Sequence, residues 1–350
     1  MLIVVENLEI DGFKILPGSA TTINIELPKL YTHSHTTMPL KVIRGKKSGP
    51  TLFVSAAIHG DEINGIEIIR RLLNYKGLNR LKGTLITIPI VNVYGVIQHS
   101  RYLPDRRDLN RSFPGSDTGS LAARLADLFM TEIVNKCTHG IDLHTGAVHR
   151  ANFPQIRANI DDPETDRLAR AFGVPVILNA SIRDGSLRQS AADYGIPMLL
   201  YEAGEALRFD EVSIRAGVDG IIKVMRELGM LYPSKRKTKT VSEPFIARSS
   251  AWTRAPQSGV LRTLVALGAH VEKQQVLGVV SDPYGVNETE IQANTSGVII
   301  GRTNLPLVNE GDALFHIARF GKAQGEVVKQ IEEFNIDRID AVVEGEEPIV

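Results

Sequence analysis

The chain has 350 residues, of which 43% are hydrophobic and 23% charged, so it is long enough to bury a sizeable core and is predicted to form two domains. Forty basic residues balance forty acidic ones, which argues against nucleic acid or an anionic membrane as partner and favours a small molecule. Its one cysteine, Cys137, excludes an intrachain disulfide and a Cys-ligated zinc cluster. Any metal must therefore be bound by histidines and carboxylates.

The N-terminal stretch MLIVVENLEIDG has no basic segment and no long apolar segment, so it does not read as a secretory signal. No apolar run approaches the 18 or so residues that a spanning helix needs. A cytoplasmic protein is expected.

Strand-like and helical patterns alternate from about residue 40 to residue 230. Apolar, β-branched runs predict strands over 51–58, 83–92, 140–146 and 196–204. Helical spacing of apolar residues predicts helices over 65–74, 120–134 and 162–173. Strands that are apolar on both faces and separated by helices indicate an α/β layer structure with a largely parallel sheet.

The pattern changes at the basic, proline-containing stretch 232–240, which is read as a solvated linker. Short glycine-punctuated segments follow, and their two halves are similar in sequence, which resembles the flattened barrel of biotinyl and lipoyl domains. Such domains carry a modifiable lysine on the hairpin between the halves, but residues 281–290, SDPYGVNETE, contain none. A structural or assembly role is therefore expected, and the chain ends with a predicted helix over 322–334 and an acidic tail.

These observations divide the chain into an α/β domain over 1–235, a β-barrel-like module over 241–320, and a C-terminal helix and tail over 321–350.

Polar groups suited to catalysis follow three of the predicted strands. His59 and Glu62 come after the first, His144 lies at the end of IDLHTG, and Glu202 ends the apolar strand that leads into YEAG. Because the carboxyl ends of parallel strands open into a common crevice, these side chains are expected to converge.

Two histidines, one carboxylate and an open fourth position make up the ligand set of a catalytic zinc, and His59, Glu62 and His144 supply it. Asp142, two residues before His144 in the same strand, would accept the other imidazole N–H. The alternatives are a polar turn in which Asp61 caps the following helix, and a core histidine bonded to a backbone carbonyl.

The segment 100–115, SRYLPDRRDLNRSFPG, contains four arginines and two prolines. Each arginine could be solvated, but Arg111 beside Asn110 offers a bidentate guanidinium and an amide, which suits recognition of a substrate carboxylate.

Four motifs occur in order: HGDE (59–62), RDLNRSFPG (107–115), DLHTG (142–146) and YEAG (201–204). Together they closely resemble the succinylglutamate desuccinylase/aspartoacylase family, relatives of the zinc carboxypeptidases. The resemblance covers roughly residues 40–230 and continues into the β-module.

The resemblance implies one zinc ion per chain on His59, Glu62 and His144. It implies that Asn110 and Arg111 orient the substrate carboxylate. Arg101, in the Arg-Tyr dipeptide, corresponds to the arginine that polarises the scissile carbonyl.

Glu202 corresponds to the general base, with Glu205 as the neighbouring alternative. A structural glutamate paired with an arginine is the competing interpretation of Glu202.

The expected fold is a three-layer, carboxypeptidase-like mixed sheet flanked by helices, followed by the small all-β module. The expected activity is zinc-dependent hydrolysis of the amide between an acyl group and the amino nitrogen of a small, amino-acid-like carboxylate. A zinc carboxypeptidase acting on small peptides and a non-catalytic metal-binding protein are the alternatives. The acyl group, the amine and a possible homo-oligomeric state stay open.

Overall fold

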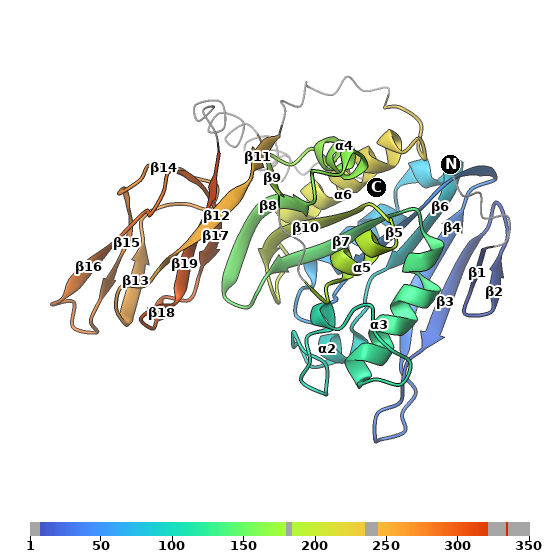
Figure 1. Ribbon diagram of the computed structural model, residues 1–350, viewed down its shortest axis with the longest axis horizontal. Helices are drawn as coiled ribbons and strands as arrows, with labels where there is room; N and C mark the ends of the chain where they lie inside the picture. The colour runs from blue at the N-terminus through green and yellow to red at the C-terminus, as the bar shows by residue number, and fades with distance from the viewer. Residues whose placement is uncertain (1–7, 180–183, 235–243, 321–333, 335–350) are drawn as a thin grey trace.

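The computed structural model describes residues 8–179, 184–234, 244–320 and 334, and a long mixed β-sheet runs through it (Figure 1). Four strands at the centre of the sheet are parallel, in the order β10-β7-β5-β6. They are β5 (Lys47–Ala56), β6 (Lys82–Ile88), β7 (His139–Gly146) and β10 (Met198–Glu205). The predicted strands over 51–58, 140–146 and 196–204 are confirmed, whereas the one over 83–92 ends at Ile88.

Antiparallel strands extend the sheet on both sides. On one side β4 (Thr37–Arg44) pairs with β6 and β3 (Ala20–Glu26) pairs with β4, while a small hairpin, β1 (Leu8–Ile10) and β2 (Phe13–Ile15), stands apart. On the other side β8 (Arg150–Ala158) runs antiparallel to β10, and β9 (Val176–Asn179) runs parallel to β8. The strands before residue 40 were not among the sequence predictions.

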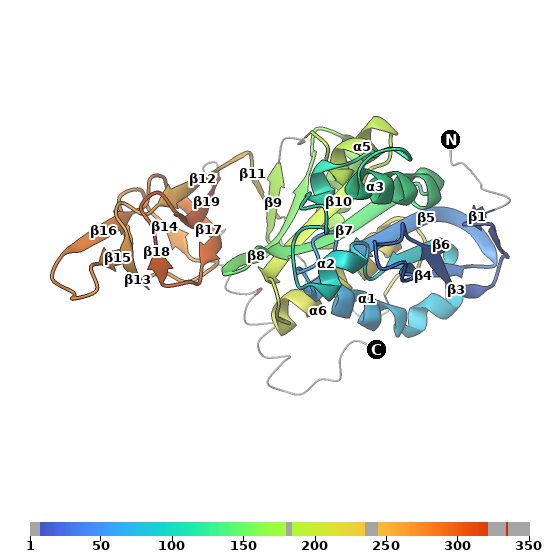
Figure 2. The same cartoon turned by 90° about the horizontal axis from the view of Figure 1, so that it is seen from below.

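Helices cover both faces of the sheet (Figure 2). One face carries α1 (Asn64–Leu73), α4 (Pro163–Phe172) and α6 (Glu211–Glu227), and the other carries α3 (Leu121–Glu132) and α5 (Leu187–Asp193) with the short α2 (Val93–Ile97). Short 3-10 turns are η1 (Lys76–Arg80), η2 (Leu109–Arg111) and η3 (Val134–Lys136). The helices predicted over 65–74, 120–134 and 162–173 are confirmed.

The central strands are buried on both faces because each face contributes to a separate core. In β5, Leu52, Val54 and Ala56 lie in the core beneath α1 and α6, and Phe53 lies in the core beneath α3. Successive strand residues point to opposite faces, so an uninterrupted apolar run is what two covered faces require. The sheet between two helical layers is therefore a mixed α/β fold.

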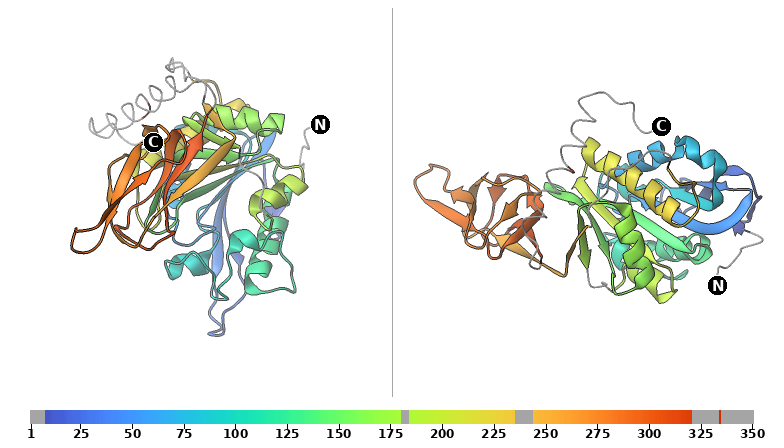
Figure 3. Two further views of the ribbon diagram at one scale, coloured as in Figure 1. Left: turned by 60° about the vertical axis from the view of Figure 1, so that its left-hand side comes forward. Right: turned by 90° about the horizontal axis from the view of Figure 1, so that it is seen from above.

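The C-terminal strands form a separate four-stranded sheet and one end of the long sheet, and these two parts share a core (Figures 1 and 3). A four-stranded sheet, in the order β16-β15-β13-β18, packs on β12, β17 and β19, while β14 pairs with β17 and β11 with β9. The bounds are β11 (Phe245–Ala247), β12 (Ser249–Arg254), β13 (Gly259–Thr263), β14 (His270–Val271), β15 (Val276–Ser281), β16 (Glu288–Gln292), β17 (Gly297–Thr303), β18 (Leu307–Val308) and β19 (Ala313–Arg319).

This group of strands, residues 245–319, is called the β-module below, and it is joined to the long sheet. Strand β17 pairs with the beginning of β8, with Gly301 opposite Asn152. The long sheet therefore passes from the helix-covered half into the β-module without interruption.

Two sequence predictions concern residues that are not described. The predicted C-terminal helix over 322–334 lies outside the described residues except for Phe334, and so does most of the predicted linker over 232–240. Among the described helices, none is long and apolar enough to cross a membrane.

Candidate metal and catalytic site

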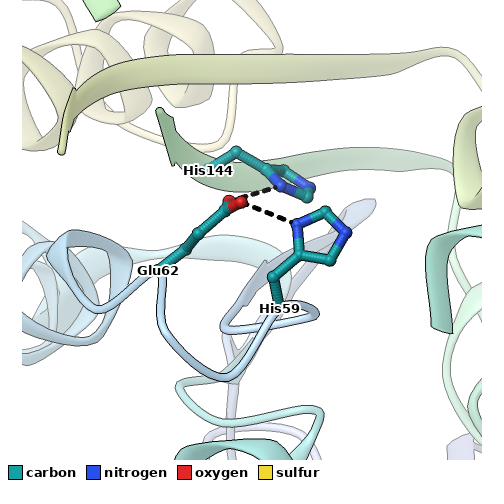
Figure 4. A group of neighbouring side chains, drawn as sticks. All are labelled: His59, Glu62 and His144. Carbon is teal, nitrogen blue, oxygen red and sulfur yellow. Dashed lines mark hydrogen bonds and ion pairs between the residues drawn. The ribbon is translucent and has the colours of Figure 1, made fainter. Parts of the chain in front are cut away.

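Three buried side chains meet where β5 and β7 end (Figure 4). His59 and Glu62 belong to the turn after β5, and His144 belongs to β7. The Nδ1 atom of His59 lies 2.8 Å from Oε1 of Glu62, and Nδ1 of His144 lies 2.8 Å from Oε2 of the same carboxylate. The potential ligand atoms of the three residues lie within 4.8 Å of one another, so this group could bind a metal ion.

The turn that carries His59 and Glu62 is held by its backbone. The N–H of Glu62 donates to the carbonyl of His59 at 3.1 Å, and Gly60 packs so closely on the backbone of Gly95 that a Cβ there would lie 2.0 Å from the Gly95 carbonyl carbon. Helix α1 begins after Ile63 without a capping side chain, so the interpretation of Asp61 as the helix cap is wrong. The turn instead presents His59 and Glu62 toward β7.

Each histidine uses its other ring nitrogen on an aspartate. His144 Nε2 lies 2.6 Å from Asp142, as the strand spacing predicts, and His59 Nε2 lies 3.2 Å from Asp108. A neutral imidazole that donates its Nε2 proton to the aspartate keeps its Nδ1 lone pair on the side of Glu62, where a cation would be bound by both groups. Two nitrogen lone pairs and a carboxylate converging in a buried site are the donor set that a divalent cation needs.

The electrostatics of the group agree with a cation site. Burial works to lower the pKa of His59 and His144, but the charges of Glu62, Asp108 and Asp142 outweigh it, so both pKa values are raised. Burial works to raise the pKa of Glu62, but the two histidines hold it well below its ordinary value. The surrounding carboxylates thus favour positive charge where the ring nitrogens meet Glu62.

Arg101 lies beside this group and is held there by Asp108. Its Nη2 donates to Asp108 at 3.0 Å, and its Nη1 lies 3.3 Å from Glu62 and 3.2 Å from Nδ1 of His59. Burial works to lower the pKa of Arg101, but Glu62 and Asp108 raise it. The guanidinium therefore stays charged at the mouth of the metal group.

Asn110 and Arg111 lie in η2 and reach the same cleft. Asn110 is buried, and its side-chain oxygen accepts from the backbone N–H of Leu187 at the start of α5 at 2.9 Å. Arg111 donates through Nη1 to the backbone carbonyl of Asn110. Part of the Asn110 amide is thus already used to hold the loop, while Arg111 is exposed and lines the cleft.

Glu202 on β10 stands next to His144 on β7, since the two residues are opposite each other in the parallel pairing. One of its oxygens, Oε2, accepts from Asn152 Nδ2 at 2.6 Å and lies 3.1 Å from Arg157 Nη2. Oε1 accepts no hydrogen bond within the described part of the chain. Glu205 differs, because it is buried against Asn304 and does not line the cleft.

Eight of the candidate residues line one cleft with a volume of about 1080 Å³. Most of its walls come from the helix-covered half, but the β-module contributes the remaining wall. The candidate residues that line the cleft are His59, Glu62, Arg101, Asn110, Arg111, Asp142, His144 and Glu202. The residues that the β-module contributes to the lining include Ser250, Trp252 and His316.

The sequence interpretation missed the residues that hold the candidates in place. Asp108 lies inside the RDLNRSFPG motif and could have been noticed there. Asn152 and Arg157 are an odd number of residues apart on β8, so in a regular strand their side chains would point to opposite faces of the sheet. Both nevertheless reach Glu202, because the pairing of β8 with β10 shifts register between Glu202 and Gly204. A register shift of this kind leaves no pattern in the sequence.

Comparison with known proteins agrees with this geometry. The chain is 28% identical over 302 residues to the N-alpha-acetyl-L-2,4-diaminobutyric acid deacetylase of Halomonas elongata, covering 82% of this chain and 87% of that protein. The fold matches the product-bound ectoine utilization protein EutE (DoeB) of Ruegeria pomeroyi with a TM-score of 0.77, at 23% identity over 86% of this chain and 97% of that one.

A succinylglutamate desuccinylase/aspartoacylase from Rhodobacter sphaeroides also matches with a TM-score of 0.77, at 22% identity over 86% of this chain and 96% of that chain. Residues 48–228, just over half of the 350, match the succinylglutamate desuccinylase/aspartoacylase catalytic domain. The chain therefore belongs to the succinylglutamate desuccinylase/aspartoacylase family.

Proposed function

We propose that the protein is a zinc-dependent amidohydrolase that removes an acyl group from the amino nitrogen of an N-acyl amino acid or a related small carboxylate. The observation that carries the proposal is the position of Glu202 directly beside His144, with its Oε1 open, in the cleft that also contains His59 and Glu62. A metal-binding protein without catalysis would have no need for a second, partly open carboxylate there.

His59, Glu62 and His144 would bind one zinc ion through Nδ1, carboxylate and Nδ1. When bound, zinc would polarise the scissile carbonyl and favour ionisation of a water molecule. Asp142 and Asp108 would accept the Nε2 protons and so leave each Nδ1 available to the metal.

Glu202 would act as general base, taking a proton from the attacking water on Oε1 and giving it to the departing amine. Asn152 and Arg157, both on Oε2, orient the carboxylate and leave only one of its oxygens in the ion pair. The interpretation of Glu202 as a structural partner of an arginine accounts for Oε2 but not for the open Oε1.

Arg101 would donate to the carbonyl oxygen as negative charge develops there, because its guanidinium is already held at the mouth of the metal group by Asp108. Arg111 would bind the substrate carboxylate through its unused N–H donors, with Asn110 beside it. With these roles, the scissile amide would lie between the two arginines and the proposed base, Glu202.

A small substrate is favoured because the β-module forms one wall of the cleft, which leaves less room for a peptide chain. The deacetylase of Halomonas elongata also favours a small substrate, because it is named for an N-acetylated diamino acid. A zinc carboxypeptidase would share the metal group and Arg111, so dipeptides belong in any substrate test.

We also propose that residues 241–320 form a unit of the flattened-barrel type without a carrier function, because the hairpin that begins at Ser281 has no lysine to modify. Intact-mass measurement after expression with biotin and lipoate ligases is expected to give the unmodified mass. An added cofactor mass would contradict a purely structural module.

The activity is tested with zinc-loaded protein on a panel of N-acetyl and N-succinyl amino acids, N-acetyl diamino acids and dipeptides, by measuring amine release. Release from at least one acyl amino acid, lost in Glu202→Gln, is the expected result. Release from dipeptides alone would identify a peptidase, and no release from any compound would contradict the proposal.

A further inference from the structure

A row of side-chain positions crosses from the catalytic half into the β-module. In the pairing of the strands, Asn152 on β8 is opposite Gly301 on β17, Gly301 is opposite His316 on β19, and His316 is opposite Trp252 on β12. Residues opposite one another in paired strands share a face of the sheet. The row therefore begins at the residue that holds Glu202 and ends at the tryptophan of the β-module.

The side chain of Trp252 extends along this row toward the catalytic half. Its indole stacks on His316 with a centroid distance of 4.5 Å and an interplanar angle of 8°, and His316 Nε2 lies 2.8 Å from Ser250 Oγ. A Cβ at Gly301 would lie 3.6 Å from Trp252 Cη2 and only 3.0 Å from Asn152 Oδ1. A side chain at Gly301 would thus crowd Asn152, whereas its contact with the indole would be an ordinary van der Waals contact.

Arg150, the first residue of β8, completes the arrangement. Its guanidinium carbon lies 5.4 Å from the centroid of the Trp252 ring, a cation–π contact. In the described part of the chain its side chain makes no hydrogen bond or ion pair. Two other arginines of the cleft differ, because Arg101 is paired with Asp108 and Arg157 with Glu202.

A guanidinium that is positioned by an aromatic ring, lines the cleft and keeps its N–H donors unused is suited to bind an anion. The ring fixes its place without neutralising its charge, which a carboxylate partner would do. Part of the side-chain ordering needed for anion binding is then already complete in the free protein.

We propose that Arg150, held by Trp252 of the β-module, binds a second carboxylate of the substrate, in addition to the one assigned to Arg111. The inference rests on the proposed deacylase function and narrows its substrate class to acyl amino acids with an additional anionic group. An amine in that place, as in a diamino acid, would be repelled by Arg150.

The additional carboxylate could belong to the acyl group or to the amino acid, so the test uses one isosteric pair for each. N-succinyl- and N-succinamoyl-L-alanine differ in charge on the acyl side, and N-acetyl-L-glutamate and N-acetyl-L-glutamine differ on the amino-acid side. Wild-type kcat/KM is expected to be higher for the charged member of one pair, and that pair identifies the side.

Arg150→Gln is expected to lower kcat/KM for the charged member of that pair by about 10- to 100-fold, because a charge-assisted hydrogen bond is lost. The neutral member should change by about 2-fold or less, and Arg150→Lys should fall in between for the charged member. The matched control is Arg262→Gln, which removes a positive charge from an exposed position of β13 outside the cleft. An equal fall for both members, or no fall for either, would overturn the assignment.

Binding can be measured without catalysis because Trp252 is the one tryptophan of the sequence. Glutarate should change its fluorescence in the zinc-loaded wild type more than the half-amide glutaramate does, and Arg150→Gln should remove that difference. A difference that persists in Arg150→Gln would overturn the assignment. If no acyl compound is hydrolysed but the fluorescence difference depends on Arg150, the proposed function fails while the anion site stands.

Discussion

The metal group and the β-module wall face the same cleft, but they depend on different kinds of structure. His59, Glu62 and His144 follow directly from the ends of neighbouring parallel strands and from one tight turn. The contact between Trp252 and Arg150 depends on the pairing of four strands, β8, β17, β19 and β12, and the paired residues Asn152 on β8 and Gly301 on β17 are 149 residues apart in the chain. The residues proposed to bind the metal can therefore come from local motifs, whereas the residues proposed to select the substrate depend on the register of strands far apart in the chain.

The largest expected effect concerns the metal group. His144→Ala should leave less than one zinc ion in ten chains by metal analysis and lower turnover by at least about 10³-fold, since Lewis-acid stabilisation is lost. His139→Ala, at the other end of β7, is the matched control and should retain zinc. Full zinc occupancy in His144→Ala would contradict the ligand assignment.

Glu202 separates catalysis from metal binding. Glu202→Gln keeps the shape and the hydrogen bond position but cannot accept a proton, so kcat should fall by about 10²- to 10⁴-fold while zinc content is unchanged. Glu205→Gln provides the comparison, because Glu205 lies outside the cleft. If Glu205→Gln shows the large loss and Glu202→Gln does not, the base has been assigned to the wrong residue.

A variant of Asp142 tests whether the carboxylate beside His144 Nε2 contributes to zinc binding. Asp142→Asn can no longer bind the imidazole N–H as a charged acceptor, so zinc affinity should fall by about 10- to 100-fold in competition with a chelator. Asp193→Asn, on the surface at the end of α5, should have the affinity of the wild type. Equal affinities for the two variants would mean that Asp142 only fills space.

A variant of Gly301 tests whether a change in the β-module wall of the cleft alters the position of the proposed base, Glu202. Gly301→Ala brings a methyl group against Asn152 Oδ1 and His316, so Asn152 must shift and Glu202 with it. We expect kcat/KM to fall by about 3- to 10-fold at constant zinc content, with a shift in the Trp252 emission maximum. Unaltered kinetics together with a shifted emission would show that the wall moves independently of the base.

Glu67 provides a measure of stability away from the cleft. Hydrogen bonds from Arg70 and Arg71 lower its pKa to about 2, against an ordinary value of 4.5. Because the folded-state pKa is depressed, the stabilisation is present above about pH 4.5 and is lost as the pH falls toward 2. Glu67→Gln should therefore lower Tm by about 2 °C at pH 7, and the difference from wild type should shrink on acidification. A difference that does not depend on pH would point to packing.

Much of the catalytic half could be predicted from the sequence because its signals are local. Apolar runs of β5 and β7 mark strands covered on both faces, and the spacing of Asp142 and His144 places both on one face. The motifs bring the remaining ligands to the same sheet edge. Glu202 was predicted at the end of an apolar strand, and it lies beside His144.

The supporting residues could not be predicted in the same way. Asn152 and Arg157 both reach Glu202 because β8 shifts register against β10. Trp252 lies on the same sheet face as Asn152 through the pairing of β8, β17, β19 and β12. Both depend on contacts between segments far apart in the chain, for which periodicity carries no information. The roles assigned to Arg101, Asn110 and Arg111 stay predictions, although all three line the cleft.

Strand β8 pairs with two strands of the C-terminal side, β17 and β9, in addition to β10, and this has a consequence for folding. Its first residues, Arg150–Asn152, pair with β17, and its last residues, 155–158, pair with β9, which itself pairs with β11. Removing everything after α6 would leave two unpaired strand edges in the catalytic half, and exposed edges of this kind promote aggregation. The two halves are therefore expected to unfold in one cooperative transition, and a shortened chain that ends after α6 is expected to be insoluble.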